Sequence, residues 1–181
     1  LRVLGVIRPT VEVIPQRTHT KHIGVLATPG TVASESYVIE LLKQDPTLIV
    51  TQQACPMWVP LIESGEHLGD GADYFVEKYL TELLTRDPLI DTIILGCTHY
   101  PLLQPKIEAF LLENSYHISV VSQGSIVADS FADYLHRHPE FSQDSKGGTC
   151  KYLTTESANK FSESASLFLS EAIEAQHIEL Q

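Results

Sequence analysis

Residues 91–101 read DTIILGCTHYP, and this stretch decides the fold class. Its first half carries an unbroken apolar run that stops at Gly96, which is typical of a strand buried on both faces of a parallel sheet. A cysteine, a threonine, a histidine and a proline follow directly, where a helix is expected to begin. Ligands of open parallel sheets bind at this carboxyl edge of the strands. The stretch therefore predicts a parallel sheet with a site at its edge that holds the thiol of Cys97.

The rest of the chain alternates short β-branched runs with longer amphipathic ones, which favours an α/β fold with a largely parallel sheet. We expect strands within residues 21–27, 48–56, 91–96, 117–124 and 150–155. Apolar residues at helical spacing predict helices over residues 32–44, 57–65, 72–87, 102–114, 125–138 and 157–175. Residues 1–9 form a short apolar run closed by Pro9, and residues 139–149 form a polar loop.

Composition narrows the function classes. The chain has 181 residues, 43% of them hydrophobic and 19% charged, which suits one ordinary domain or two small ones. Its net charge of −11 argues against nucleic acid as a partner, because binding a phosphate backbone needs clustered lysine and arginine. No apolar run approaches the roughly 20 residues of a membrane helix, and no signal-peptide layout opens the chain. The three cysteines form no CxxC pair, which favours reduced thiols and a cytoplasmic location.

Two strand-to-helix junctions resemble each other, VLATPGT at residues 25–31 and ILGCTHYP at residues 94–101. Both place small or hydroxyl residues where a strand ends. Exposed backbone N–H groups and the positive end of a helix favour a carboxylate at such a place. The sequence thus predicts two anion-binding corners, one of which carries a thiol.

Cys97 has a chemical and a structural interpretation. A helix start or an adjacent imidazole can lower a thiol pKa from about 8.5 and produce a reactive thiolate. Alternatively, a free cysteine packs as a small buried side chain, and this role is assigned to Cys55 and Cys150. A zinc site is disfavoured because Cys97 and His99 form one ligand pair and no second pair is visible. A cysteine hydrolase stays open, although nothing marks the histidine that would serve as its base.

The motif around Cys97 resembles a known family. LGCTHYPLL, residues 95–103, is similar to the second catalytic-cysteine motif of glutamate racemases. Similar family segments cover nearly the whole chain: VLGVIRPTV (3–11), IGVLATPGTV (23–32), ACPMWVPLIESG (54–65), SQGSIVADSFADYL (122–135) and CKYLTTESANKF (150–161). Arg8 departs from the pattern, because the family usually has an acidic residue there.

The resemblance implies racemisation of L-glutamate to D-glutamate for peptidoglycan synthesis, with no cofactor and no metal. In the family one cysteine thiolate removes the Cα proton and a second cysteine on the opposite face returns one. Cys97 matches the second cysteine, which acts on L-glutamate, and His99 matches the histidine that assists it. Thr98 and His99 match positions that contact the substrate.

Three further residues are implied as substrate-binding. Thr28 and Thr31 match hydroxyl residues of the other corner, and Glu63 matches an acidic residue that tunes His99 or the substrate ammonium group. The structural alternatives are an exposed glutamate at a helix end and a histidine that caps or packs.

Other family features are missing. The chain has no counterpart of the DSGxGG, PYG or CNTA segments, the last of which carries the first catalytic cysteine. On the family's template of two pseudo-symmetric α/β domains, residues 22–122 are the second domain. Residues 1–21 and 123–181 are then parts of a discontinuous first domain. The chain begins with Leu1 and its only methionine is Met57, so we expect it to be processed, trimmed or a piece of a longer protein.

Two alternatives therefore stay open. One is a catalytically incomplete fragment that acts as a carboxylate-binding or interaction module, and the other is a racemase of a related amino acid. The apolar faces of the predicted helices at 124–137 and 157–175 would lack partners. We expect them to be exposed, to pair in a homodimer, or to be covered by a longer protein.

Overall fold

The computed structural model describes residues 4–141, 149–169 and 171–180, which form two compact units. The first unit is Leu1–His136 and the second is Arg137–Gln181. The domain assignment made from the sequence stays a prediction. Each unit is described by itself.

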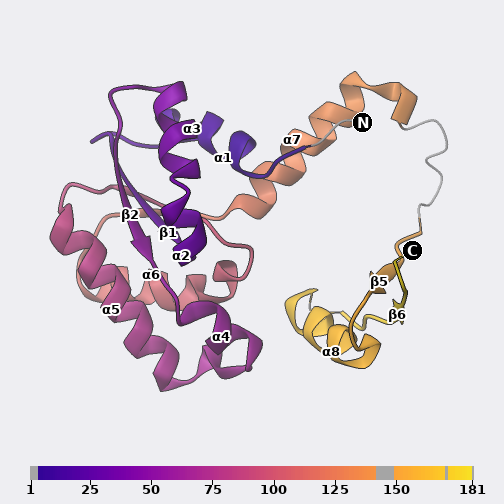
Figure 1. The fold of residues 1–181 in the computed structure, drawn as a ribbon. Helices are drawn as coiled ribbons and strands as arrows, with labels where there is room; N and C mark the ends of the chain where they lie inside the picture. The colour runs from indigo at the N-terminus through magenta and orange to yellow at the C-terminus, as the bar shows by residue number, and fades with distance from the viewer. Residues whose placement is uncertain (1–3, 142–148, 170, 181) are drawn as a thin grey trace. The chain divides into compact units, whose positions relative to one another are not determined.

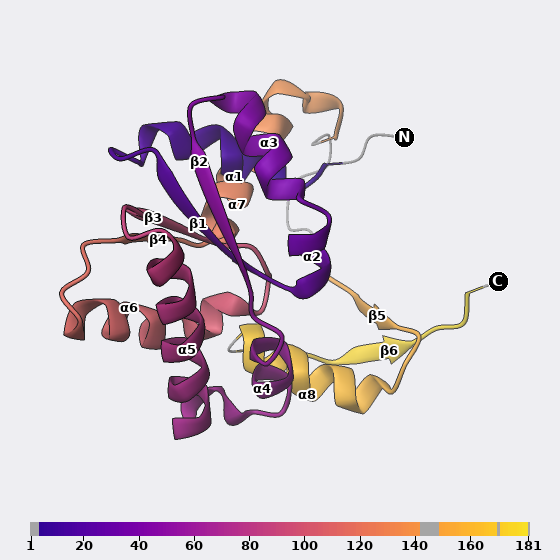
Figure 2. The same ribbon diagram turned by 60° about the vertical axis from the view of Figure 1, so that its left-hand side comes forward.

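The first unit is built on a four-stranded sheet with the strand order β2-β1-β3-β4; Figure 1 labels β1 and β2, and Figure 2 labels all four strands. Its strands are β1 (His22–Ala27), β2 (Ile49–Ala54), β3 (Thr92–Leu95) and β4 (Ser119–Val121). All three pairings are parallel, which confirms the predicted fold class. The two inner strands are β1 and β3, and every residue of β3 is buried, as its apolar run predicts.

Helices cover both faces of this sheet (Figure 2). They are α1 (Ile7–Val13), α2 (Pro29–Ala33), α3 (Ser36–Gln44), α4 (Trp58–Glu63), α5 (Asp70–Arg86), α6 (Gln104–Glu113) and α7 (Gln123–Arg137), with short 3-10 turns η1 (Ile14–Gln16), η2 (Glu66–Leu68) and η3 (Tyr100–Leu103). On one face Val11, Tyr37 and Leu41, from α1 and α3, pack against Val25 and Ile94 of the sheet. On the other face the helix α5 approaches so closely that a Cβ on Gly24 would lie 2.9 Å from Leu83 Cδ2. This packing removes apolar surface from water, which is the main stabilising term of the fold.

Two local predictions in this unit are wrong. The run before Pro9 continues into α1, because proline is tolerated in the first turn of a helix, where its missing N–H is not needed. The single helix predicted over residues 32–44 is instead α2 and α3, separated at Glu35, which has the left-handed φ of 52°. The Ser34 hydroxyl donates to the Thr31 carbonyl at 2.8 Å, a local bond of the kind that competes with a continuing helix.

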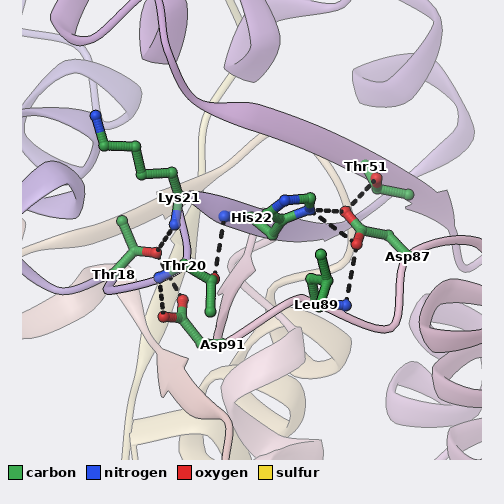
Figure 3. A network of polar contacts seen from close by, with 8 residues as sticks. All are labelled: Thr18, Thr20, Lys21, His22, Thr51, Asp87, Leu89 and Asp91. Carbon is green, nitrogen blue, oxygen red and sulfur yellow. Dashed lines mark hydrogen bonds and ion pairs between the residues drawn. The ribbon is translucent and has the colours of Figure 1, made fainter.

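A polar clamp closes the amino-terminal edge of the sheet, opposite the edge that carries Cys97 (Figure 3). The Asp91 carboxylate accepts the Thr18 hydroxyl at 2.7 Å and the N–H groups of His19 and Thr20 at 2.6 and 2.8 Å. Burial raises the pKa of Asp91, but these hydrogen bonds and one from Thr92 outweigh it and hold the pKa at about 2. The clamp fixes the segment that leads into β1 against the start of β3.

A second contact at this edge joins β1 to the end of α5. Both oxygens of Asp87 lie 2.9 Å from His22 Nδ1, and the Thr51 hydroxyl donates to Asp87 at 3.3 Å. Asp87 is buried, so this pairing supplies the hydrogen bonds that a carboxylate needs away from water.

The second unit contains a parallel pair of strands, β5 (Tyr152–Thr154) and β6 (Ala175–His177), joined by α8 (Ala158–Leu169). A 3-10 turn, η4 (Pro139–Phe141), precedes them. The helix predicted over residues 157–175 is therefore too long, and β6 was not predicted. Two serines of α8 hold the returning chain: Ser166 accepts the Ile173 N–H and Ser162 accepts the Ala175 N–H, both at 2.9 Å. Most of the loop predicted over residues 139–149 lies outside the described residues.

Candidate functional site

Three neighbouring strands end together at the carboxyl edge of the sheet. Leu26 of β1 is in register with Leu95 of β3, and Ala27 with Ala54 of β2. The Gly96 N–H donates to the Leu26 carbonyl at 2.8 Å, and the Cys55 N–H donates to the Ala27 carbonyl at 2.9 Å. The loops that begin at Thr28, Cys55 and Cys97 therefore leave the same edge.

Close packing disfavours a side chain on the residue before Cys97, which is Gly96. A Cβ on Gly96 would lie 3.0 Å from the ring atom Cε2 of Tyr37 and 3.2 Å from both Ala27 Cβ and the Leu26 carbonyl oxygen. The last two neighbours belong to the core of the sheet and have little room to yield. Gly96 therefore lets the chain turn out of the sheet at this point and present Cys97 at the edge.

Cys97, His99 and Glu63 form a row of three side chains. His99 Nδ1 lies 3.8 Å from Cys97 Sγ, and His99 Nε2 lies 3.3 Å from Glu63 Oε1. A proton on Nε2 faces the Glu63 carboxylate and leaves the Nδ1 lone pair directed at the thiol. The imidazole can then accept the thiol proton, and the carboxylate can stabilise the imidazolium that results. Glu63 ends α4, so this row joins two elements that the sequence separates by more than thirty residues.

Burial raises the pKa of the Cys97 thiol above its ordinary value. The backbone N–H groups of His99, Tyr100 and Thr98 act in the opposite direction, while the Glu63 charge adds to the increase. The sequence led us to expect that a helix start and an imidazole would lower the pKa of Cys97, but burial outweighs such an effect. The α-helix α6 begins only at Gln104, after η3. The raised pKa favours the protonated thiol, so a neighbouring base would assist formation of the thiolate.

Thr28 and Thr31 lie at the first turn of α2. The Thr28 hydroxyl oxygen accepts the Thr31 N–H at 3.4 Å, and the two hydroxyl oxygens lie 3.0 Å apart. Thr28 is thus the N-cap of the helix, a role for which threonine is favoured. Thr98 is exposed next to Cys97. The substrate-binding roles implied for these residues stay predictions.

Residues that the sequence did not single out hold the loop around Cys97 in place. Gln123 Nε2 donates to the Leu95 carbonyl at 2.8 Å, and the Thr10 hydroxyl donates to Gln123 Oε1 at 3.3 Å. The Tyr100 hydroxyl donates to the Cys55 carbonyl at 3.2 Å. No local pattern could have found these contacts, because the partners lie 28 to 113 residues apart.

The other two cysteines differ from Cys97. Cys55 is buried and its thiol donates to the Gln53 carbonyl at 3.6 Å, which confirms its predicted packing role. Burial raises the pKa of Cys55 far above its ordinary value. Cys150 is exposed in the second unit, so the prediction that it packs is wrong.

Within residues 4–141, 149–169 and 171–180, no three or more His, Cys, Asp or Glu side chains gather where they could hold a metal ion. The same residues include no helix that is long and apolar enough to cross a bilayer.

Comparison with known proteins identifies similar sequences, although no family model matches. The chain is 38% identical over 167 residues to a glutamate racemase from Shouchella clausii and 36% identical over 182 residues to one from Lactiplantibacillus plantarum. These matches cover 92% and 98% of the chain, respectively. The chain spans only 58% and 64% of the length of these two relatives.

Solved structures give a concordant result. A glutamate racemase isoform from Bacillus anthracis matches with a TM-score of 0.88 and 30% identity, over 99% of this chain and 65% of its own. A glutamate racemase from Francisella tularensis, solved in complex with D-glutamate, matches with a TM-score of 0.78 and 25% identity. That match covers 97% of this chain and 62% of the Francisella chain.

Proposed function

We propose that the protein interconverts L- and D-glutamate without a cofactor, because nearly the whole chain is similar to glutamate racemases. The observation that carries this proposal is the row of Cys97, His99 and Glu63 at the carboxyl edge of the parallel sheet. The Francisella relative binds D-glutamate, which supports glutamate as the ligand. The proposal includes a cytoplasmic location, a role in peptidoglycan synthesis and a homodimeric assembly.

The proposed chemistry begins with the Cys97 thiol. His99 Nδ1 accepts the thiol proton, and Glu63 stabilises the imidazolium. The thiolate then removes the Cα proton from the L-glutamate face, and the reverse transfer returns a proton to the same face. A positioned acid and base of this kind contributes about a hundredfold to ten-thousandfold to a rate. Inversion also needs an acid on the opposite face, which is the role of the other family cysteine.

The substrate groups are assigned by charge. The backbone N–H and hydroxyl of Thr98 and the hydroxyls of Thr28 and Thr31 suit carboxylate oxygens. The negative charge of the Glu63 carboxylate, which lies beside His99, suits the substrate ammonium group. A related amino acid with the same α-carboxylate and ammonium groups would use these contacts equally well, so a related racemase is the nearest alternative.

A second candidate function is a carboxylate-binding module without turnover. It is favoured by the burial of Cys55, whose thiol donates to the Gln53 carbonyl and is poorly suited to serve as an acid for the opposite face. One thiolate can exchange the Cα proton of L-glutamate but cannot by itself invert the centre.

Proton NMR in D₂O distinguishes these functions. L- or D-glutamate is incubated with the chain, loss of the Cα–H signal is followed, and chiral chromatography measures the enantiomer formed. We expect loss from L-glutamate that disappears in Cys97→Ala and persists in the control Cys150→Ser, which removes the exposed thiol of the second unit.

The stereochemical outcome then decides the mechanism. Inversion identifies a complete racemase, whereas exchange with retention identifies Cys97 as the base of one face only. Saturable binding of glutamate without exchange supports the binding module. Exchange that persists in Cys97→Ala would exclude the proposed role of this thiol.

A further inference from the structure

We propose that Gln123 is a positioning residue for Cys97, because its side-chain amide fixes the main chain from which the thiol projects. The inference deepens the proposed function, since it matters to catalysis only if Cys97 is the reactive group. Gln123 is the first residue of α7, and the chain passes through twenty-five residues between Cys97 and Gln123 before it returns to this point.

The peptide unit between Leu95 and Gly96 is held from both sides. Its N–H donates to the Leu26 carbonyl of β1 at 2.8 Å, and its carbonyl accepts Gln123 Nε2 at 2.8 Å. In a parallel sheet the second of these bonds would ordinarily come from a backbone N–H of the next strand. That strand, β4, is in register with β3 only as far as Val121 opposite Ile94. The side chain of Gln123 thus extends the ladder by one hydrogen bond after β4 has ended.

The Gln123 side chain is itself anchored. The Thr10 hydroxyl of α1 lies 3.3 Å from Gln123 Oε1 and 3.0 Å from the Val6 carbonyl oxygen, and its single proton is shared between these two acceptors. The Tyr37 side chain of α3 also interacts with the Gln123 side chain, which lowers the pKa of Tyr37 against the larger effect of burial. An amide with several partners has one favoured orientation, so Gln123 acts as a fixed bracket between α1, α3 and β3.

Gln123 contacts two groups that lie next to Gly96. The first is the peptide unit on the amino-terminal side of Gly96, and the second is the side chain of Tyr37, whose ring limits the space at the Gly96 Cα atom. Glycine has no side chain to restrict its dihedral angles, so its neighbours must supply the restriction. Loss of the bracket would let the main chain rotate at Gly96 and carry the thiol away from the N–H groups of residues 98–100.

Those N–H groups stabilise the thiolate, so a displaced thiol becomes harder to ionise. Four further side chains interact electrostatically with Cys97: Glu63, Tyr37, Cys55 and Tyr100. In addition, His99 contacts the thiol directly. None of these is changed when Gln123→Met is compared with Gln52→Met, so the ionisation of Cys97 in that comparison reports on the bracket itself.

The test measures how fast iodoacetamide alkylates Cys97 as a function of pH, in the full chain carrying Cys150→Ser to remove the exposed thiol. Gln123→Met keeps the length and volume of the side chain and removes the amide. The matched control is Gln52→Met, the same change at a partly buried glutamine of β2 whose amide donates to the Val32 carbonyl at 3.4 Å. Peptide mass spectrometry identifies the alkylated cysteine.

In Gln123→Met we expect the midpoint of the alkylation profile to rise by about half a pH unit or more, which reduces the thiolate fraction at pH 7 roughly threefold. Gln52→Met should keep the parent midpoint. An unchanged or lowered midpoint in a folded Gln123→Met chain would overturn the proposal. If that variant does not fold, Thr10→Val and Tyr37→Phe remove the anchors singly, and parent-like midpoints in both would overturn it.

This readout does not require glutamate turnover. A shifted midpoint in a chain without racemase activity supports the bracket and counts against the proposed function alone. Activity that depends on Cys97, together with unchanged midpoints, would support the proposed function and reject the bracket.

Discussion

Opposing effects act on the pKa of Cys97, and no single neighbouring group determines it alone. Burial and the Glu63 carboxylate raise its pKa, whereas three consecutive backbone N–H groups lower it. The net increase favours the protonated thiol. A protonated thiol suits the proposed role, in which Cys97 acts as acid in one direction and as base in the other.

The contribution of Glu63 can be measured by removing its charge. Glu63→Gln should lower the pKa of Cys97, so that alkylation of Cys97 at pH 7.5 becomes about two- to threefold faster at low ionic strength. The Glu63 side chain is 60% exposed, so salt should screen most of this difference. The control is Glu66→Gln, which removes an exposed carboxylate of η2. Equal acceleration by both variants would mean that net charge, rather than the row of three side chains, sets the reactivity of Cys97.

At the residue scale the sequence predicted the members of the row and missed the groups that hold them. Cys97 and His99 are two residues apart, so a motif can identify them. Glu63 was carried over from a family segment, and its contact with His99 is tertiary. Gln123 has no local signal at all, because its function depends on where β4 ends relative to β3.

At the scale of elements, the strand β3 connects the two polar ends of the sheet. Asp91 precedes it at the clamped edge, and Gly96 and Cys97 follow it at the site edge. Strongly apolar elements such as β3 and α5 were predictable, the first from its unbroken apolar run and the second from apolar residues at helical spacing. The break at Glu35 and the return of the chain along α8 were not, because they involve hydrogen bonds between serine hydroxyls and backbone groups.

The clamp at Asp91 predicts a specific dependence of stability on pH. Its folded pKa of about 2 lies below the value of about 3.9 for an unfolded aspartate, so the stabilisation is complete above pH 4. It is lost as the pH falls from about 4 to about 2, because the unfolded chain then binds a proton more readily than the folded one. Urea unfolding followed by circular dichroism should show a shallower loss in this range for Asp91→Asn than for the parent.

The control for this prediction is Glu77→Gln, which removes an exposed carboxylate of α5 that takes no part in the clamp. Asp91→Asn should also be less stable than the parent at pH 7, since an amide cannot accept the same charge-assisted bonds. A slope between pH 4 and pH 2 that is the same in Asp91→Asn and the parent would show that other carboxylates govern acid unfolding.

At the scale of the whole molecule, the core is distributed unequally between the two units. The buried apolar residues of α1, α3, α5 and the sheet all belong to Leu1–His136. Among the described residues of Arg137–Gln181, the buried ones are Thr154 and Ile173. Since burial of apolar surface is the main source of stability, the second unit has much less to keep it folded.

Hydrogen exchange followed by mass spectrometry should reveal this difference. We expect amides of β5, α8 and β6 to exchange at least about tenfold faster than those of β1 and β3, because local opening of the second unit exposes little apolar surface. Peptides from α5, a helix of the first unit, serve as the internal reference. Equal protection in both units would mean that the chain opens as one cooperative body.

The sequence by itself determined the alternation of strands and helices, the parallel class of the sheet, the resemblance to glutamate racemases, and the placement of Cys97 at a strand exit. These follow from periodicity and from contiguous motifs, which are local properties of the chain. Only the tertiary structure decided the strand order β2-β1-β3-β4, the meeting of Glu63 with His99, the raised pKa of Cys97 and the bracket formed by Gln123. Those features depend on burial and on contacts between residues far apart in the chain, and they exist only once the sheet has assembled.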